Sequence, residues 1–147
     1  MQSDIVSCEE MARFGVEPGW SFAIRHRVRW SECDPFGHAN HRAYFEWFEE
    51  ARNRYLEAVG LAPLSPLTPG PVIAETGIRY YRPLAYADEI LVNARTVRLG
   101  RTSFEMGIRR VARRAVRTRP RRADTDGKCD RPKGHAVTRA AQPHSQP

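Results

Sequence analysis

The sequence has 147 residues, a net charge of +7 and three cysteines. This length fits one domain with a single core, and an odd number of cysteines without metal-ligand spacing excludes a disulfide framework and a cysteine metal site. No segment approaches the roughly 18 apolar residues of a membrane span, and the acidic N-terminus lacks a secretory signal, so we expect a cytoplasmic protein without membrane contact.

The positive charge is confined to the last part of the chain. Residues 1–108 contain 12 Arg against 14 Asp and Glu, a net charge of −2, whereas residues 109–147 contain 10 Arg and 2 Lys against 3 Asp, a net charge of +9. We therefore expect no nucleic-acid binding by the folded part. Binding of nucleic acid or an anionic surface through counterion release stays open for the basic tail alone.

The first segments predict an arm followed by a strand. Residues 1–20 show no sustained periodicity and end in a Pro-Gly turn, which is typical of a loosely held N-terminal arm without chemistry. Residues 22–30 alternate in polarity, which predicts a half-buried strand. The core face of this strand would consist of Phe22, Ile24, His26, Val28 and Trp30.

A turn with one carboxylate then leads into a helix. Residues 33–60 read C-D-P-F-G-H-A-N-H-R-A-Y-F-E-W-F-E-E-A-R-N-R-Y-L-E-A-V-G. Their spacing predicts a helix over residues 41–59, with Asn40 as N-cap and Gly60 at the C-terminal stop. The buried face of this helix would carry Tyr44, Trp47, Phe48, Ala51, Tyr55, Ala58 and Val59.

Asp34 in this turn is the candidate reactive group. A helix N-terminus exposes unpaired N–H groups and a partial positive charge, which suit a developing oxyanion. Asp34 and the helix start together would form half of an acyl-transfer site. The alternative interpretation is that Asp34 only closes an Asp-Pro turn, as such residues commonly do.

The remaining pattern predicts a sheet that holds this helix. Residues 61–71 contain four prolines and must form a loop, whereas residues 72–81, 90–99 and 102–111 read as strands. The last two strands flank a Leu-Gly-Arg turn and form a hairpin, with Phe104, Met106 and Ile108 facing the core. The fold class is therefore α+β, with one long helix packed on a curved antiparallel sheet.

The chain after Val111 offers no further strand in its pattern. It is rich in Arg and Pro and has no aromatic residue, so we expect disorder, or a frameshifted or replaced C-terminus that the alternative coding frames would reveal. The predicted organisation is an N-terminal arm at 1–20, a folded domain at 21–112 and a basic tail at 113–147.

Three segments resemble the hotdog-fold acyl-CoA thioesterases of the 4-hydroxybenzoyl-CoA thioesterase type. They are W-x-x-x-D-P-F-G-H-A-N-H-x-x-Y-F-E-W-F-E-E-A-R at residues 30–52, the later G-I-R-Y-Y-R-P-L-A-Y-A-D-E-I, and L-G-R-T-S-F. The resemblance covers residues 22–110. It implies a hotdog fold, here apparently lacking the last strand, and hydrolysis of an acyl-CoA. It also implies no cofactor and no metal, and a homodimer or dimer of dimers with sites at the subunit interface.

Carried over by residue, the resemblance places the catalytic carboxylate on Asp34 and the oxyanion-binding amide at His41. His38 and Asn40 match the turn and helix entry, where His38 would bond the thioester, Asp34 or only the turn, and Asn40 reads more readily as a cap than as a catalyst. The candidate substrate-binding residues are Gly37, Tyr44, Ser103 and Arg82, and the candidate arginines for coenzyme A phosphates are Arg79, Arg82, Arg98 and Arg101.

Two questions stay open at this point. Asp34 can act as a nucleophile or as a general base on water. The function can also differ: a non-catalytic hotdog remnant, a binder acting through the basic tail, an acyl-ACP thioesterase and a hotdog dehydratase are the alternatives to an acyl-CoA thioesterase.

Overall fold

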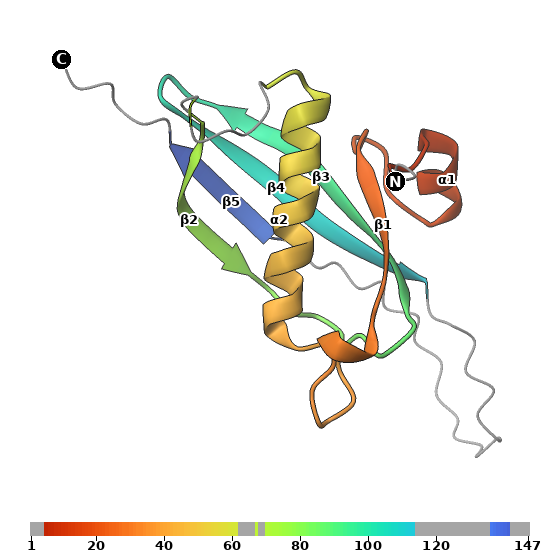
Figure 1. Cartoon of the computed structure of the whole chain (residues 1–147). Helices are drawn as coiled ribbons and strands as arrows, with labels where there is room; N and C mark the ends of the chain where they lie inside the picture. Colours follow the sequence, from red (N-terminus) through yellow and green to blue (C-terminus); the bar gives the residue numbers. More distant parts are fainter. Residues whose placement is uncertain (1–4, 62–66, 68–69, 114–135, 142–147) are drawn as a thin grey trace.

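One long helix lies across one face of an antiparallel sheet (Figure 1). The structure, a computed structural model, describes residues 5–61, 67, 70–113 and 136–141. For residues 113 and 136–141 it describes the backbone only. The sheet has five strands in the order β1-β3-β4-β5-β2, so the predicted α+β class is confirmed. The elements are α1 (Cys8–Arg13), β1 (Ala23–Arg27), η1 (Trp30–Glu32), α2 (His41–Ala58), β2 (Val72–Ile78), β3 (Glu89–Leu99), β4 (Ser103–Arg113) and β5 (Ala136–Ala141).

Strands β3 and β4 form the predicted hairpin and supply the centre of the sheet. Leu99 pairs with Phe104 at the turn, and the ladder continues to Glu89 and Arg113 at the other end. Met106 and Ile108 are buried on the face that α2 covers, as the alternation predicted. The hairpin therefore forms the floor on which the helix lies.

Helix α2 begins and ends close to the predicted limits. The side chain of Asn40 accepts a hydrogen bond from the Arg42 N–H at 3.0 Å, and Gly60 has φ +87°, a conformation that favours glycine at a helix end. Val59, predicted to be buried, is 56% exposed, and Leu56 is buried in its place. No helix in the described ranges is long and apolar enough to cross a membrane.

The expectation that the last strand is lacking is wrong. Strand β5 lies between β4 and β2 and pairs antiparallel with both, so it belongs to the sheet although it comes from the predicted tail. Its sequence, A-V-T-R-A-A, has few β-branched residues, and backbone pairing on both sides holds it in place. The rest of the tail, including its predicted disorder and its suggested frameshift, lies outside the described residues.

The expectation of a loosely held N-terminal arm is also wrong for residues 5–20. The short helix α1 packs Met11 and Phe14 against Leu91, on the sheet face opposite α2. Six residues are too few to show helical periodicity, which explains why the sequence pattern missed this helix.

Trp30 departs from its predicted inward position. Strand β1 ends at Arg27, and Trp30 begins the 3-10 turn η1, which breaks the alternation of the strand. The indole is 77% exposed and packs edge-on against Tyr86, with ring centroids 5.8 Å apart.

Candidate active site

Asp34 holds the short loop that connects η1 to α2. Its Oδ1 accepts hydrogen bonds from the N–H groups of Phe36 at 2.9 Å and His38 at 3.3 Å, and its own N–H donates to the His38 carbonyl at 2.8 Å. Oδ2 makes no hydrogen bond within the described part of the chain. Asp34 thus closes the turn with one oxygen, and its other oxygen has no hydrogen-bond partner among the described residues.

The first turn of α2 offers an unused donor. The Arg42 and Ala43 N–H groups are satisfied by Asn40, whereas the N–H of His41 has no partner among the described residues. This is the position that sequence reasoning assigned to the oxyanion. Asn40 serves as the helix cap, which is the simpler of its two predicted roles.

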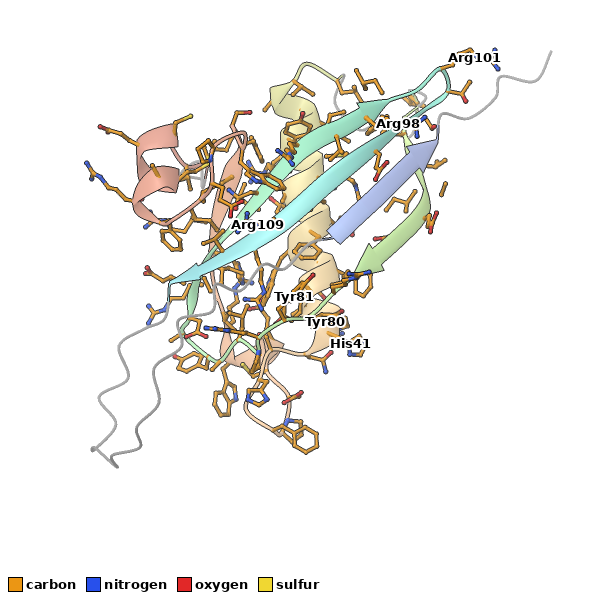
Figure 2. All side chains as sticks on the ribbon, turned by 180° about the vertical axis from the view of Figure 1, so that it is seen from behind. His41, Tyr80, Tyr81, Arg98, Arg101 and Arg109 are labelled. Atoms are coloured by element: carbon orange, nitrogen blue, oxygen red, sulfur yellow. The ribbon has the colours of Figure 1, made fainter. Side chains whose placement is uncertain are left out.

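Asp34 and His41 line the same pocket of about 410 Å³. Figure 2 shows His41, Tyr80 and Tyr81 at one end of the molecule. Tyr44 forms part of the wall and meets Tyr80 edge to face, with ring centroids 5.0 Å apart. The other lining residues are Ala39, Tyr81, Arg82 and Pro83.

A buried arginine lies behind this wall. The guanidinium of Arg110 on β4 sits over the Tyr44 ring, 5.4 Å from its centroid, and donates to the Arg82 carbonyl. Burial raises the pKa of Tyr44 and lowers the pKa of Arg110. The phenol of Tyr44 in the pocket wall is therefore backed by the Arg110 cation in a cation–π contact.

Cys33 is a poor alternative nucleophile despite its place beside Asp34. Burial and the neighbouring charges of Glu32 and Asp34 raise the pKa of its thiol, which disfavours the reactive thiolate.

No three His, Cys, Asp or Glu side chains gather as metal ligands anywhere in the ranges that the structure describes.

Ser103 and two of the candidate arginines lie far from Asp34 in the same chain. Arg110 packs beside the pocket, and Ser103 is seven residues away along β4, about 23 Å at about 3.3 Å per residue. Figure 2 shows Arg98 and Arg101 at the hairpin end of the sheet, opposite His41. One chain alone does not bring these residues together with Asp34.

Two predicted residues serve the loop itself rather than the pocket lining. Gly37 has φ +79°, which a residue with a side chain adopts at a cost, and its N–H donates to the Asp34 carbonyl at 2.9 Å. The His38 side chain is exposed and contacts Asp34 only through its backbone.

Sequence reasoning missed Tyr80, Tyr81, Arg110 and Glu32. The first two belong to a segment that matched the resemblance but received no role. Arg110 continues the inward alternation of Met106 and Ile108, and a cation at a core position is the signal that could have identified it.

Glu32 has a depressed pKa. Burial would raise it, but hydrogen bonds from the Arg29 N–H, Trp47 and His26, together with the charge of His26, hold the pKa of Glu32 below its usual 4.5. The carboxylate therefore stays ionised at neutral pH.

We expect the stability that Glu32 supplies to disappear in acid. A group with a depressed folded-state pKa stabilises the fold above its unfolded-state pKa, and this contribution is lost as the pH falls through the folded value. The Tm difference between wild type and Glu32→Gln should be largest at neutral pH and shrink below pH 4.5. Thermal melts across this range check it, and a difference that is independent of pH contradicts it.

The sequence of this chain matches a known protein family. The sequence profile of the thioesterase-like superfamily matches residues 28–129. The chain belongs to this superfamily. The hotdog-fold thioesterase resemblance is therefore confirmed at the level of the family, whereas the 4-hydroxybenzoyl-CoA type stays a prediction.

This thioesterase-like protein is similar to one relative in sequence and to several solved structures in fold. A provisionally named esterase of Aquifex aeolicus (strain VF5) is 32% identical over 85 residues, which cover 56% of this chain and 66% of that protein, just under two thirds. A thioesterase-superfamily structure from Jannaschia sp. CCS1 has a TM-score of 0.74 at 21% identity, covering 94% of this chain and 79% of the other. A Thermus thermophilus thioesterase complexed with coenzyme A and Zn has a TM-score of 0.63 at 26% identity, covering 86% of this chain and 87% of the other.

Proposed function

We propose that this protein hydrolyses acyl-CoA thioesters, with Asp34 and the N–H of His41 acting on the thioester carbonyl. One observation carries the proposal. Oδ2 of Asp34 and the N–H of His41 both lack a hydrogen-bond partner among the described residues, and the two residues line the same pocket. The carboxylate would supply the base or nucleophile, and the amide would stabilise the oxyanion.

The chemistry of a thioester suits so small a site. The leaving thiol has a pKa of about 8.5, so it departs as a thiolate without a strong general acid. Tyr44 and Tyr80 would enclose the acyl group, and the N–H of His41 would donate to the carbonyl oxygen as negative charge develops there.

Two routes remain for Asp34. As a nucleophile, Oδ2 attacks the carbonyl carbon, the thiolate leaves, and water hydrolyses the resulting anhydride. As a general base, Asp34 removes a proton from water, which attacks instead. A single turnover in ¹⁸O-labelled water tests for the nucleophilic route. Label in the Asp34 carboxylate identifies an anhydride that water opened at the Asp34 carbonyl carbon. Label only in the product acid fits general-base attack or an anhydride opened at the acyl carbon.

Coenzyme A as the carrier is supported by the Thermus relative, whose structure contains coenzyme A. The direct test is thiol release from a panel of short aliphatic and aromatic acyl-CoAs, with the same acyl groups on acyl carrier protein as a second arm. We expect hydrolysis of at least one acyl-CoA above the spontaneous rate. Hydrolysis of the carrier-protein substrates alone would reassign the carrier, and no hydrolysis of either would refute the proposal.

We further propose a homodimer joined along β2. This edge strand is exposed on both faces over most of its length, with Val72 53% and Ile73 46% exposed, and its outer edge has no neighbouring strand among the described residues. An unprotected edge of this kind pairs readily with another strand.

Antiparallel pairing of two β2 strands would complete the site. Through β5, Val72 is level with Ser103, whereas Ile78 is level with Ile108 and leads directly to Tyr80. A two-fold axis across β2 would place the Val72 end of one copy beside the Ile78 end of the other. The hairpin with Ser103, Arg98 and Arg101 would then approach the Asp34 pocket of the second copy.

A further inference from the structure

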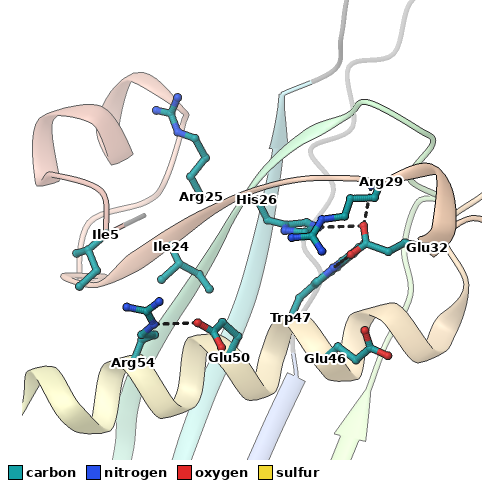
Figure 3. Close-up of a pocket in the computed structure, with 10 residues that line it drawn as sticks. All are labelled: Ile5, Ile24, Arg25, His26, Arg29, Glu32, Glu46, Trp47, Glu50 and Arg54. Carbon is teal, nitrogen blue, oxygen red and sulfur yellow. Dashed lines mark hydrogen bonds and ion pairs between the residues drawn. The ribbon is translucent and has the colours of Figure 1, made fainter. Parts of the chain in front are cut away.

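The carboxylate of Glu32 joins three elements beside the Asp34 loop (Figure 3). Oε2 accepts from the Arg29 N–H at 2.7 Å and lies 3.0 Å from Nε2 of His26 on β1, while Oε1 accepts from Nε1 of Trp47 on α2 at 3.0 Å. The side chain is 11% exposed. Three donors therefore converge on one nearly buried carboxylate.

The backbone of Glu32 also closes the base of the loop. Its carbonyl accepts from the N–H of Asn40, the cap of α2, at 2.7 Å, and the next pair inward, Cys33 and Ala39, forms a β-bridge. Glu32 thus contacts both ends of the segment that carries Asp34 and leads to the His41 N–H.

We propose that Glu32 is a positioning residue that fixes Asp34 relative to the start of α2. The side chain fastens the loop base to β1 and α2, and the backbone fastens it to the helix cap, so the separation of Asp34 from the His41 N–H depends on Glu32. The inference rests on the proposed function, in which both groups act on one carbonyl.

The same cluster supports the wall of the Asp34 pocket. The Trp47 ring packs against His26 and against Tyr44, with centroids 5.0 Å apart in each pair. Releasing the indole N–H from Glu32 frees a ring that holds Tyr44 in place. Errors in position of about 1 Å are enough to slow an oriented reaction by about 100-fold.

Glu32→Gln tests the role because an amide cannot replace both oxygens. Whichever way the amide turns, its NH₂ group faces a donor, either Trp47 on one side or Arg29 and His26 on the other. We expect kcat to fall about 10- to 100-fold, with KM changed less than about threefold.

Trp47→Phe provides a matched double-mutant cycle. It removes the N–H donor and keeps an aromatic ring, so alone it should lower kcat by a smaller factor. In the Glu32→Gln background it removes one donor conflict, so its additional effect should be smaller still or reversed. If the fold-losses in kcat of the two single variants simply multiply in the double variant, the two residues do not act together on the loop.

Glu46→Gln is the control. Glu46 and Glu32 line the same 330 Å³ pocket, but Glu46 pairs with Arg42 at 3.6 Å and does not contact Glu32.

Amide hydrogen exchange of residues 33–41 gives a readout independent of activity. We expect faster exchange there in Glu32→Gln and not in Glu46→Gln. Unchanged exchange and kcat in folded Glu32→Gln would overturn the inference. If wild type hydrolyses no thioester, the proposed function fails, and hydrogen exchange alone decides whether Glu32 positions the loop.

Discussion

Asp34→Asn should lower kcat for acyl-CoA hydrolysis about 1,000-fold while the protein remains folded. The Asn side-chain oxygen can still accept from the Phe36 N–H, which Asp34 Oδ1 binds at 2.9 Å, so the loop keeps its closing hydrogen bond. The second oxygen, which would attack or take a proton, becomes an NH₂ group. Thiol release with purified protein, normalised to the folded fraction from thermal melts, gives the result.

Asp88→Asn is the matched control for this change. Asp88 also closes a turn, because its Oδ2 accepts from the Ala85 N–H at 2.9 Å. If carboxylates in this region act only on turn geometry, the two Asn variants should lose similar activity. Retention of more than about a tenth of the wild-type kcat by Asp34→Asn would remove Asp34 from the chemistry.

At substrate concentrations well below KM, mixing two variants that each have little activity there should restore activity to about a quarter of the wild-type value. One variant carries Asp34→Asn and the other carries Arg98→Ala with Arg101→Ala. In the proposed dimer, each site takes Asp34 from one copy and the hairpin arginines from the other. Random exchange makes half of the dimers mixed, and each mixed dimer contains one intact site.

The arginine substitutions should act mainly through KM, because they would remove partners of the coenzyme A phosphates. The mixing assay is therefore run at substrate concentrations well below the wild-type KM, after unfolding and refolding the variants together. Each variant refolded alone is the control. Mixed dimers that form, as judged by differently tagged copies, but recover no activity would show that each site lies within one chain.

Local chemistry made the helix and the hairpin predictable. Asn40 and Gly60 each act on the few residues at their own end of the helix, and the apolar face recurs every three to four residues between them. The limits of α2 therefore agree with the prediction almost to the residue. The same holds for the β3–β4 turn, where Leu99 and Phe104 face each other across a short connection. Neighbouring residues decide such features, and the sequence displays them directly.

Long-range contacts made the remainder unpredictable. Strand β5 is held by backbone partners on β2 and β4, and its own side chains carry little strand propensity. The hydrogen-bond partners of Glu32 include His26, six residues away, and Trp47, fifteen residues away. No rule of sequence spacing connects these three residues. Asp34 and His41 were predicted as a pair because one turn joins them, whereas the tyrosines of the pocket wall arrive from a distant segment.

The position of β5 determines when the sheet can be completed during synthesis. Among the described strands, β2 has β5 as its only neighbour, although some 60 residues separate them in sequence. A nascent chain can assemble α2 on β1, β3 and β4 while β2 has no strand to join, and contacts of such large separation form slowly. The edge proposed to pair two copies therefore joins the sheet only after residues 136–141 have been synthesised, so β5 sets the earliest point at which the proposed dimer can form.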